Sequence, residues 1–77
     1  MDVAEIAQQL AQAEIHVAAG ERLIAGQRDT IAEFEKAHAD PAEAKAVLAS
    51  LEETQRLHVE NRDRLKRELE RAARNHG

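Results

Sequence analysis

The chain of 77 residues contains no cysteine, has 34% charged residues and carries a formal net charge of −4. These values exclude disulfide bonds and thiolate metal sites, and chains this short often need oligomerisation to build a stable core. No apolar run reaches the length of about 18 residues that a membrane span requires. The N-terminus also lacks the basic and apolar regions of a secretory signal, so we expect a cytoplasmic protein.

The first half of the sequence predicts one long helix over about residues 2–37. Asp2 followed by Glu5 has the pattern of a capping box at its start. Apolar or small residues then recur at alternating spacings of three and four, which is the period of one helix face. This stripe contains Val3, Ile6, Leu10, Ala13, Val17, Gly20, Ile24, Gln27, Ile31 and Phe34. Gly20 and Gly26 are not accompanied by proline or a turn cluster, so we expect the helix to be continuous.

Residues 38–40 are predicted to form a turn, because Pro41 disfavours a helical conformation at Asp40. Asp40 is then the expected N-cap, Pro41 the first helical residue and Glu43 the partner in a second capping box. A second helix is therefore predicted over about residues 41–74. Its stripe repeats the same spacings at Ala44, Leu48, Leu51, Gln55, His58, Arg62, Leu65, Leu69 and Ala72.

Charged residues on the second helix follow a pattern that is typical of a solvated surface. Acids precede bases by four residues in the pairs Glu52/Arg56, Glu60/Arg64, Asp63/Arg67 and Glu70/Arg74. Residues 56–77 carry seven bases against four acids, whereas residues 1–55 carry four bases against eleven acids. Folding the chain back brings the basic stretch beside the acidic one. We interpret this asymmetry as internal complementarity and expect no nucleic-acid partner.

A turn this short makes the two helices antiparallel neighbours in a single domain over residues 1–77. The predicted fold is therefore an all-α, two-helix hairpin. A hairpin of two helices cannot cover its own apolar stripe, and the simplest partner is a second copy of the chain. We expect a homodimer that forms a four-helix bundle with coiled-coil-like packing.

Polar residues interrupt the stripe halfway along the predicted hairpin. They are His16, Gln27, Gln55, His58 and Arg62, with Gly20 beside them. One interpretation is structural, because polar groups in a bundle can fix the register and the number of partners. A second is a binding site for a small polar or anionic ligand formed by these five side chains. A third is pH sensing by the two histidines. The Glu-x-x-His spacing of carboxylate metal sites is absent, so we expect no metal or other cofactor.

Catalytic patterns are also missing from the sequence. Ser50 is the only serine, it lies within a predicted helix, and no context for its activation is present. Tyrosine and a glycine-rich phosphate loop are absent too. We therefore expect no enzyme and no catalytic residue. The predicted function is a non-catalytic, self-associating helical module for protein–protein interaction, and the alternative is the ligand-binding protein described above.

Two stretches of the sequence share a pattern with other proteins. The first is His16-Val17-Ala18-Ala19-Gly20-Glu21-Arg22 with Ile24 and Gln27-Arg28, and the second is Glu52-Glu53-Thr54-Gln55 with Leu57-His58-Val59 and Arg62-Asp63-Arg64-Leu65. This pattern resembles that of a group of short bacterial α-helical proteins with no assigned activity. The resemblance covers about residues 12–69 and implies a small bacterial helical protein. It assigns no functional residue.

Overall fold

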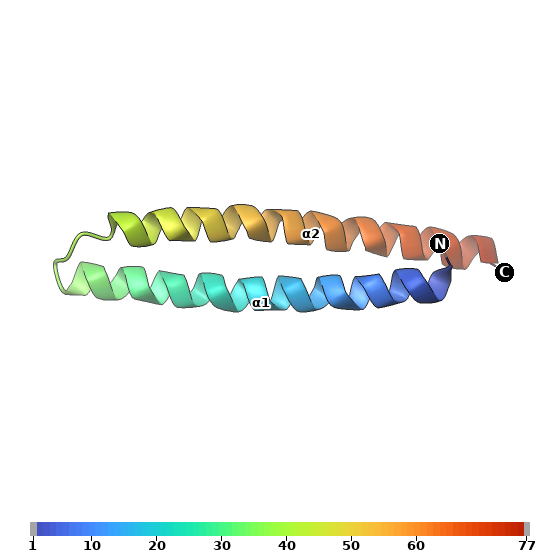
Figure 1. Cartoon of the computed structure of the whole chain (residues 1–77), viewed down its shortest axis with the longest axis horizontal. Coiled ribbons are helices and arrows are strands. Elements are labelled where there is room, and N and C mark those ends of the chain that lie inside the picture. Colours follow the sequence, from blue (N-terminus) through green and yellow to red (C-terminus); the bar gives the residue numbers. More distant parts are fainter. Residues whose placement is uncertain (1, 77) are drawn as a thin grey trace.

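A computed structural model describes residues 2–76 and shows two helices folded into an antiparallel hairpin (Figure 1). Helix α1 spans Val3–Lys36 and helix α2 spans Ala42–His76. The molecule measures 61 × 14 × 13 Å, with the connection at one end and both ends of the chain at the other. The predicted two-helix hairpin is confirmed, and each helix begins and ends within two residues of the expected position.

The start of α1 has the expected cap. Asp2 has an extended backbone, and its Oδ1 accepts a hydrogen bond of 2.8 Å from the main-chain N–H of Glu5. This bond satisfies one of the N–H groups that have no partner in the first turn of a helix. The helix then continues through Gly20 and Gly26 without interruption, as predicted.

The end of α1 is a Schellman motif that the sequence did not predict. His38 adopts a left-handed conformation with φ of 57°, and its N–H donates to the carbonyl of Glu35 at 3.1 Å. The N–H of Ala39 donates to the carbonyl of Phe34 at 2.9 Å. These are the two bonds that define the motif, in which glycine usually occupies the left-handed position.

The start of α2 differs from the prediction by one residue. The Pro41 carbonyl accepts the first hydrogen bond of the helix, from Lys45 N at 2.8 Å, so α2 begins at Ala42. Pro41 therefore lies just before the helix and not at its first position. Asp40 still contributes to the cap, because its Oδ1 accepts from Ala42 N at 3.0 Å.

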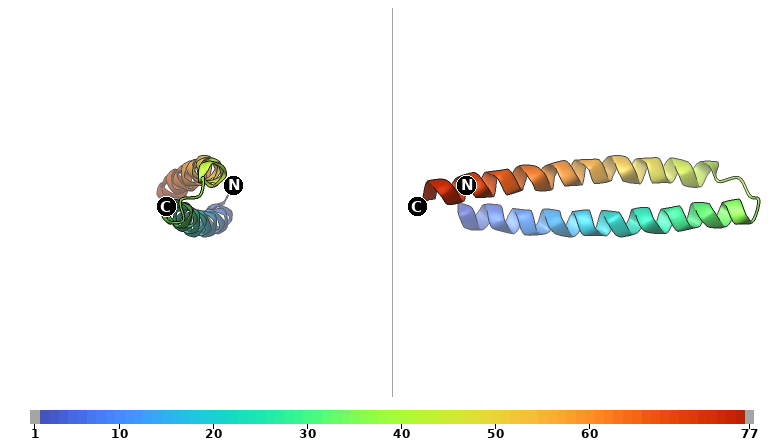
Figure 2. Two further views of the ribbon diagram at one scale, coloured as in Figure 1. Left: turned by 90° about the vertical axis from the view of Figure 1, so that its left-hand side faces the viewer. Right: turned by 180° about the vertical axis from the view of Figure 1, so that it is seen from behind.

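The core between the helices is thin. The buried hydrophobic residues are Ile6, Ala13, Val17, Ile31, Ala44 and Leu65. Even Leu65, the most deeply buried of them, keeps 2% of its surface exposed. Figure 2 shows the reason: α1 and α2 lie side by side over most of their length, with the end of α2 extending past the start of α1, so each helix is covered on one side by the other. Phe34 was predicted to lie in the apolar stripe, but it is 40% exposed because this single layer leaves it at the edge.

The partners in the surface ion pairs differ from those that the sequence predicted. In the described part of the chain, Arg56 pairs with Glu53 and also with Glu60, the latter at 2.8 Å, and Arg64 pairs with Glu68 at 2.8 Å. The predicted acid-before-base pairs are not formed there. One reason is competition from α1, since Arg28 contacts Glu52 at 3.2 Å across the hairpin. A second bridge between the helices joins Lys45 to Glu35 at 3.8 Å. Neither helix, within the residues described, has a segment apolar and long enough to cross a membrane.

Candidate functional site

The two histidines of the polar middle layer lie side by side. Their ring centroids are 5.3 Å apart and the ring planes are inclined by 49°. His16 comes from α1 and is exposed, whereas His58 comes from α2 and is half-buried. The antiparallel hairpin brings them together as predicted. pH sensing by this pair stays a hypothesis, whose basis is that two positively charged rings at this distance would repel each other.

Gln55 connects the helices next to the histidine pair. Its Nε2 donates a hydrogen bond of 2.9 Å to the main-chain carbonyl of Val17. Its Oε1 is buried without a hydrogen-bond partner among the described residues and lies against Gly20. A Cβ atom at residue 20 would overlap this oxygen. The absence of a side chain at Gly20 therefore makes room for the Gln55 amide.

Gln27 makes the reciprocal connection closer to the turn. Its Nε2 donates to the main-chain carbonyl of Ala44 at 2.9 Å, so each helix sends one glutamine amide to the backbone of the other. The sequence placed Gln27 beside Gln55, but the structure separates them, because the Gln27 side chain reaches towards the start of α2. Two such bonds at different heights hold the helices in one longitudinal register, as the structural interpretation of the middle layer requires.

Arg62, one turn after His58 on α2, pairs with its neighbour in the sequence. Its Nε and Nη2 each contact Asp63 Oδ1 at 3.0 Å, and its side chain is 30% exposed. The guanidinium group of Arg62, which was expected to bind an anion, is therefore already paired with the carboxylate of Asp63. Three of the five residues, His16, Gln55 and His58, line one common hollow. Gln27 and Arg62 do not line it: Gln27 contacts the carbonyl of Ala44 and Arg62 pairs with Asp63.

A shallow groove runs along the side of the hairpin that carries the two histidines. Its middle section has a volume of about 130 Å³ and is lined by His16, Ala19, Gly20, Leu23, Leu51, Thr54, Gln55 and His58. Towards the ends of the chain it continues from His16 into a section of about 490 Å³ bordered by the amides of Gln9, Gln12 and Asn61. A third section of about 410 Å³ lies near the turn and is lined by Phe34 and Val47 among others; it shares no lining residue with the middle section.

Sequence reasoning missed the apolar residues of this groove. Leu23 and Val47 are 59% and 48% exposed, and neither belongs to the apolar stripe. A second alternation of three and four was present in the sequence, one position before the stripe, at Gln12, His16, Ala19 and Leu23. Helices that pack against two neighbours have a wide apolar face of this kind. The second alternation could therefore have identified the groove.

Among the described residues, one exposed pair, Glu53 and Arg56, has shifted pKa values. A hydrogen bond and the positive charge of Arg56 lower the pKa of Glu53, and the same contact, with help from Glu60, raises the pKa of Arg56. Both side chains are more than half exposed, so the pair supports the helix surface and is not a reactive site. Within residues 2–76, no group of three acidic or histidine side chains is arranged to hold a metal ion.

No family model, curated protein or solved structure matches this chain.

Proposed function

We propose that the chain is a non-catalytic, self-associating helical module, and that two hairpins form a homodimeric four-helix bundle. The observation that carries this proposal is that some of the buried apolar residues are small, whereas several large apolar side chains stay exposed. The buried ones include two alanines, whereas Leu23, Phe34 and Val47 are all at least 40% exposed. A hairpin of this size has little core of its own, and association is a common way to supply one.

The geometry of helical bundles supports a second hairpin as the missing cover. In a four-helix bundle each helix packs against two neighbours, whereas here α1 and α2 have only one neighbour each. The charged outer surface of the bundle would then be available for contact with a further protein. The cytoplasmic location and the absence of nucleic-acid and membrane partners stay predictions.

The alternative function, binding of a small polar or anionic ligand, has less support. Gln27 and Gln55 already donate to backbone carbonyls, and Arg62 contacts Asp63. A ligand would have to displace these bonds, each of which contributes on the order of 1 kcal/mol. The groove beside the histidines is open along its length and is better suited to a helix surface than to a small molecule.

Sedimentation equilibrium over a wide range of dilution tests the proposal. We expect a mass of twice the 8.6 kDa of the chain at the higher concentrations, with dissociation on dilution. A mass of 8.6 kDa at every concentration, with the helical circular dichroism intact, would show that the hairpin is stable alone. That result would remove the argument for a shared core.

A further inference from the structure

Three of the exposed apolar side chains lie on one face of the hairpin. Phe34 follows Leu23 by eleven residues, which places the two only about 20° apart around α1. Val47 is seven residues from Thr54, which lines the central section of the groove, so these two also share one side of α2. We call this the neutral face and define it by His16, Leu23, Phe34, Val47, Leu51 and His58.

Charged residues border the neutral face only near its two ends. All residues that line the central section of the groove are uncharged when the histidines are neutral. Glu5 and Arg64 line the section near the chain ends, and Asp40 and Glu43 line the section near the turn. In a chain with 34% charged residues, an uncharged surface across the middle of both helices is a marked departure from the average composition.

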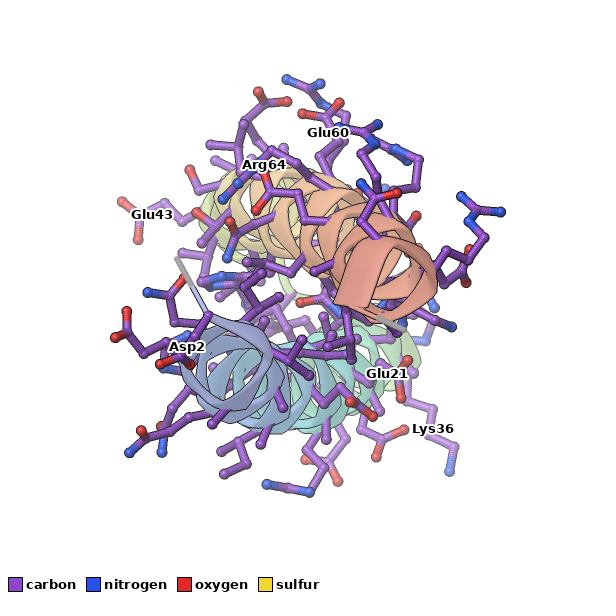
Figure 3. The ribbon with its side chains drawn as sticks, turned by 90° about the vertical axis from the view of Figure 1, so that its right-hand side faces the viewer. Asp2, Glu21, Lys36, Glu43, Glu60 and Arg64 are labelled. Atoms are coloured by element: carbon purple, nitrogen blue, oxygen red, sulfur yellow. The ribbon has the colours of Figure 1, made fainter. Side chains whose placement is uncertain are left out.

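The opposite face of the hairpin carries charged side chains. Arg28 lies about 140° around α1 from Leu23, with the core side of the helix between them. It forms the bridge to Glu52 that crosses from α1 to α2. Figure 3, viewed along the axis of the hairpin, shows Glu43 on one long side and Glu21 on the other. The two long faces are therefore distinguished by charge.

From this arrangement we infer that a second copy of the chain packs on the neutral face. The inference rests on the proposed self-association and adds the surface that carries it. Packing on the neutral face covers the exposed side chains of Leu23 and Val47, whereas contact through the opposite face has to accommodate the bridge from Arg28 to Glu52. The whole hairpin measures 61 by 14 Å, so the projected area of one long side is at most roughly 850 Å², close to the area of about 800 Å² that each partner buries in a standard interface.

Matched charge substitutions test this surface. Leu23→Glu and Val47→Glu place a carboxylate on the neutral face, at residues that are 59% and 48% exposed in the single hairpin. Ile15→Glu and Leu57→Glu are the controls, because these residues are 57% and 53% exposed and do not line the groove. We expect the first two variants to weaken association by at least about tenfold in sedimentation, and the two controls to leave it unchanged.

A labelling experiment tests the same surface even if a glutamate variant loses its helical structure. The chain has no cysteine, so Thr54→Cys on the groove and Ala25→Cys elsewhere on the surface each introduce a single thiol. We expect maleimide labelling of Cys at residue 54 to slow as the protein concentration rises, and labelling at residue 25 to stay constant.

The possible results separate the inference from the proposed function. If the unmodified chain is dimeric but Ile15→Glu or Leu57→Glu dissociates it while Leu23→Glu does not, self-association holds and the neutral face is the wrong surface. Equal labelling rates at residue 54 in dilute and concentrated samples of a proven dimer lead to the same conclusion. If the unmodified chain is monomeric throughout, the proposed function fails and the inference fails with it.

Discussion

Gly20 on α1 provides the space that the side-chain amide of Gln55 occupies on α2. The amide then reaches the carbonyl of Val17 at 2.9 Å, one turn earlier on α1. The glycine and the glutamine therefore act as a pair, in which one residue is small so that the other can connect the helices. Together with the bond from Gln27 to Ala44, this contact sets the register of the hairpin.

The two glycines of α1 should respond differently to substitution by alanine. Gly26 has no atom within 4 Å of an added Cβ, so Gly26→Ala should raise the free energy of unfolding by about 1 kcal/mol through helix propensity. Gly20→Ala gains the same propensity but displaces the Gln55 amide and its bond to Val17, which contributes about 1 kcal/mol, so we expect almost no net change. Urea unfolding of both variants at one protein concentration measures the difference. An equal gain in both would show that the Gln55 contact adds no stability.

Replacement of Gln55 itself tests whether the middle layer is structural. Its Oε1 is buried without a partner, and such groups cost about 1–3 kcal/mol. We therefore expect Gln55→Leu to raise the melting temperature and to keep the association state, even though the bond to Val17 is lost. Gln55→Ala, which leaves a cavity, should lower it. A lower melting temperature for Gln55→Leu would show that the bond to Val17 contributes more stability than the buried Oε1 costs.

The end of α1 offers a simple route to higher stability. His38 has a φ of 57°, a left-handed conformation that costs a residue with a side chain roughly 1–2 kcal/mol. We expect His38→Gly to raise the free energy of unfolding by about 1 kcal/mol, because glycine adopts this conformation without steric strain. His38→Ala is the control and should show no such gain, since alanine keeps the strain. Calorimetry on the three proteins distinguishes these outcomes.

The titration of Glu53 should depend on its neighbour. Arg56 lowers the pKa of Glu53 below the ordinary value of 4.5, mainly through a hydrogen bond and then through its charge. The favourable contact is therefore complete above the ordinary pKa and is lost as the pH falls through the lowered one. Arg56→Gln should return the Glu53 pKa towards 4.5 in carboxyl-detected NMR titrations. Arg71→Gln, far along α2, should not; an unchanged Glu53 pKa in Arg56→Gln would contradict the contact.

Much of the architecture was predictable because it depends on periodicity and on one proline. The alternation of three and four located both helices, and Pro41 located the turn, from which the proximity of His16 and His58 followed. The cap at His38 could not be predicted, because no glycine marks it in the sequence. The bond from Gln27 to Ala44 depends on which of several rotamers the glutamine adopts, and periodicity does not specify this.

The surface was the least predictable part for a related reason. The sequence pattern assigned Phe34 to the core because it lies on the stripe, but burial depends on how many helices surround that stripe. The partners of Arg56 and Arg64 likewise depend on competition among several acids within reach. A single sequence shows which residues are available for such contacts, and the packed structure decides which of them form.

The dependence of thermal stability on protein concentration tests the central claim most directly, because a core completed by association must weaken on dilution. We expect the melting temperature from circular dichroism to rise by several degrees over a hundredfold increase in concentration. Leu23→Glu should abolish this rise and Ile15→Glu should preserve it. A melting temperature that is the same at every concentration, in a sample that is fully helical when most dilute, would contradict the claim that the hairpin depends on a second copy.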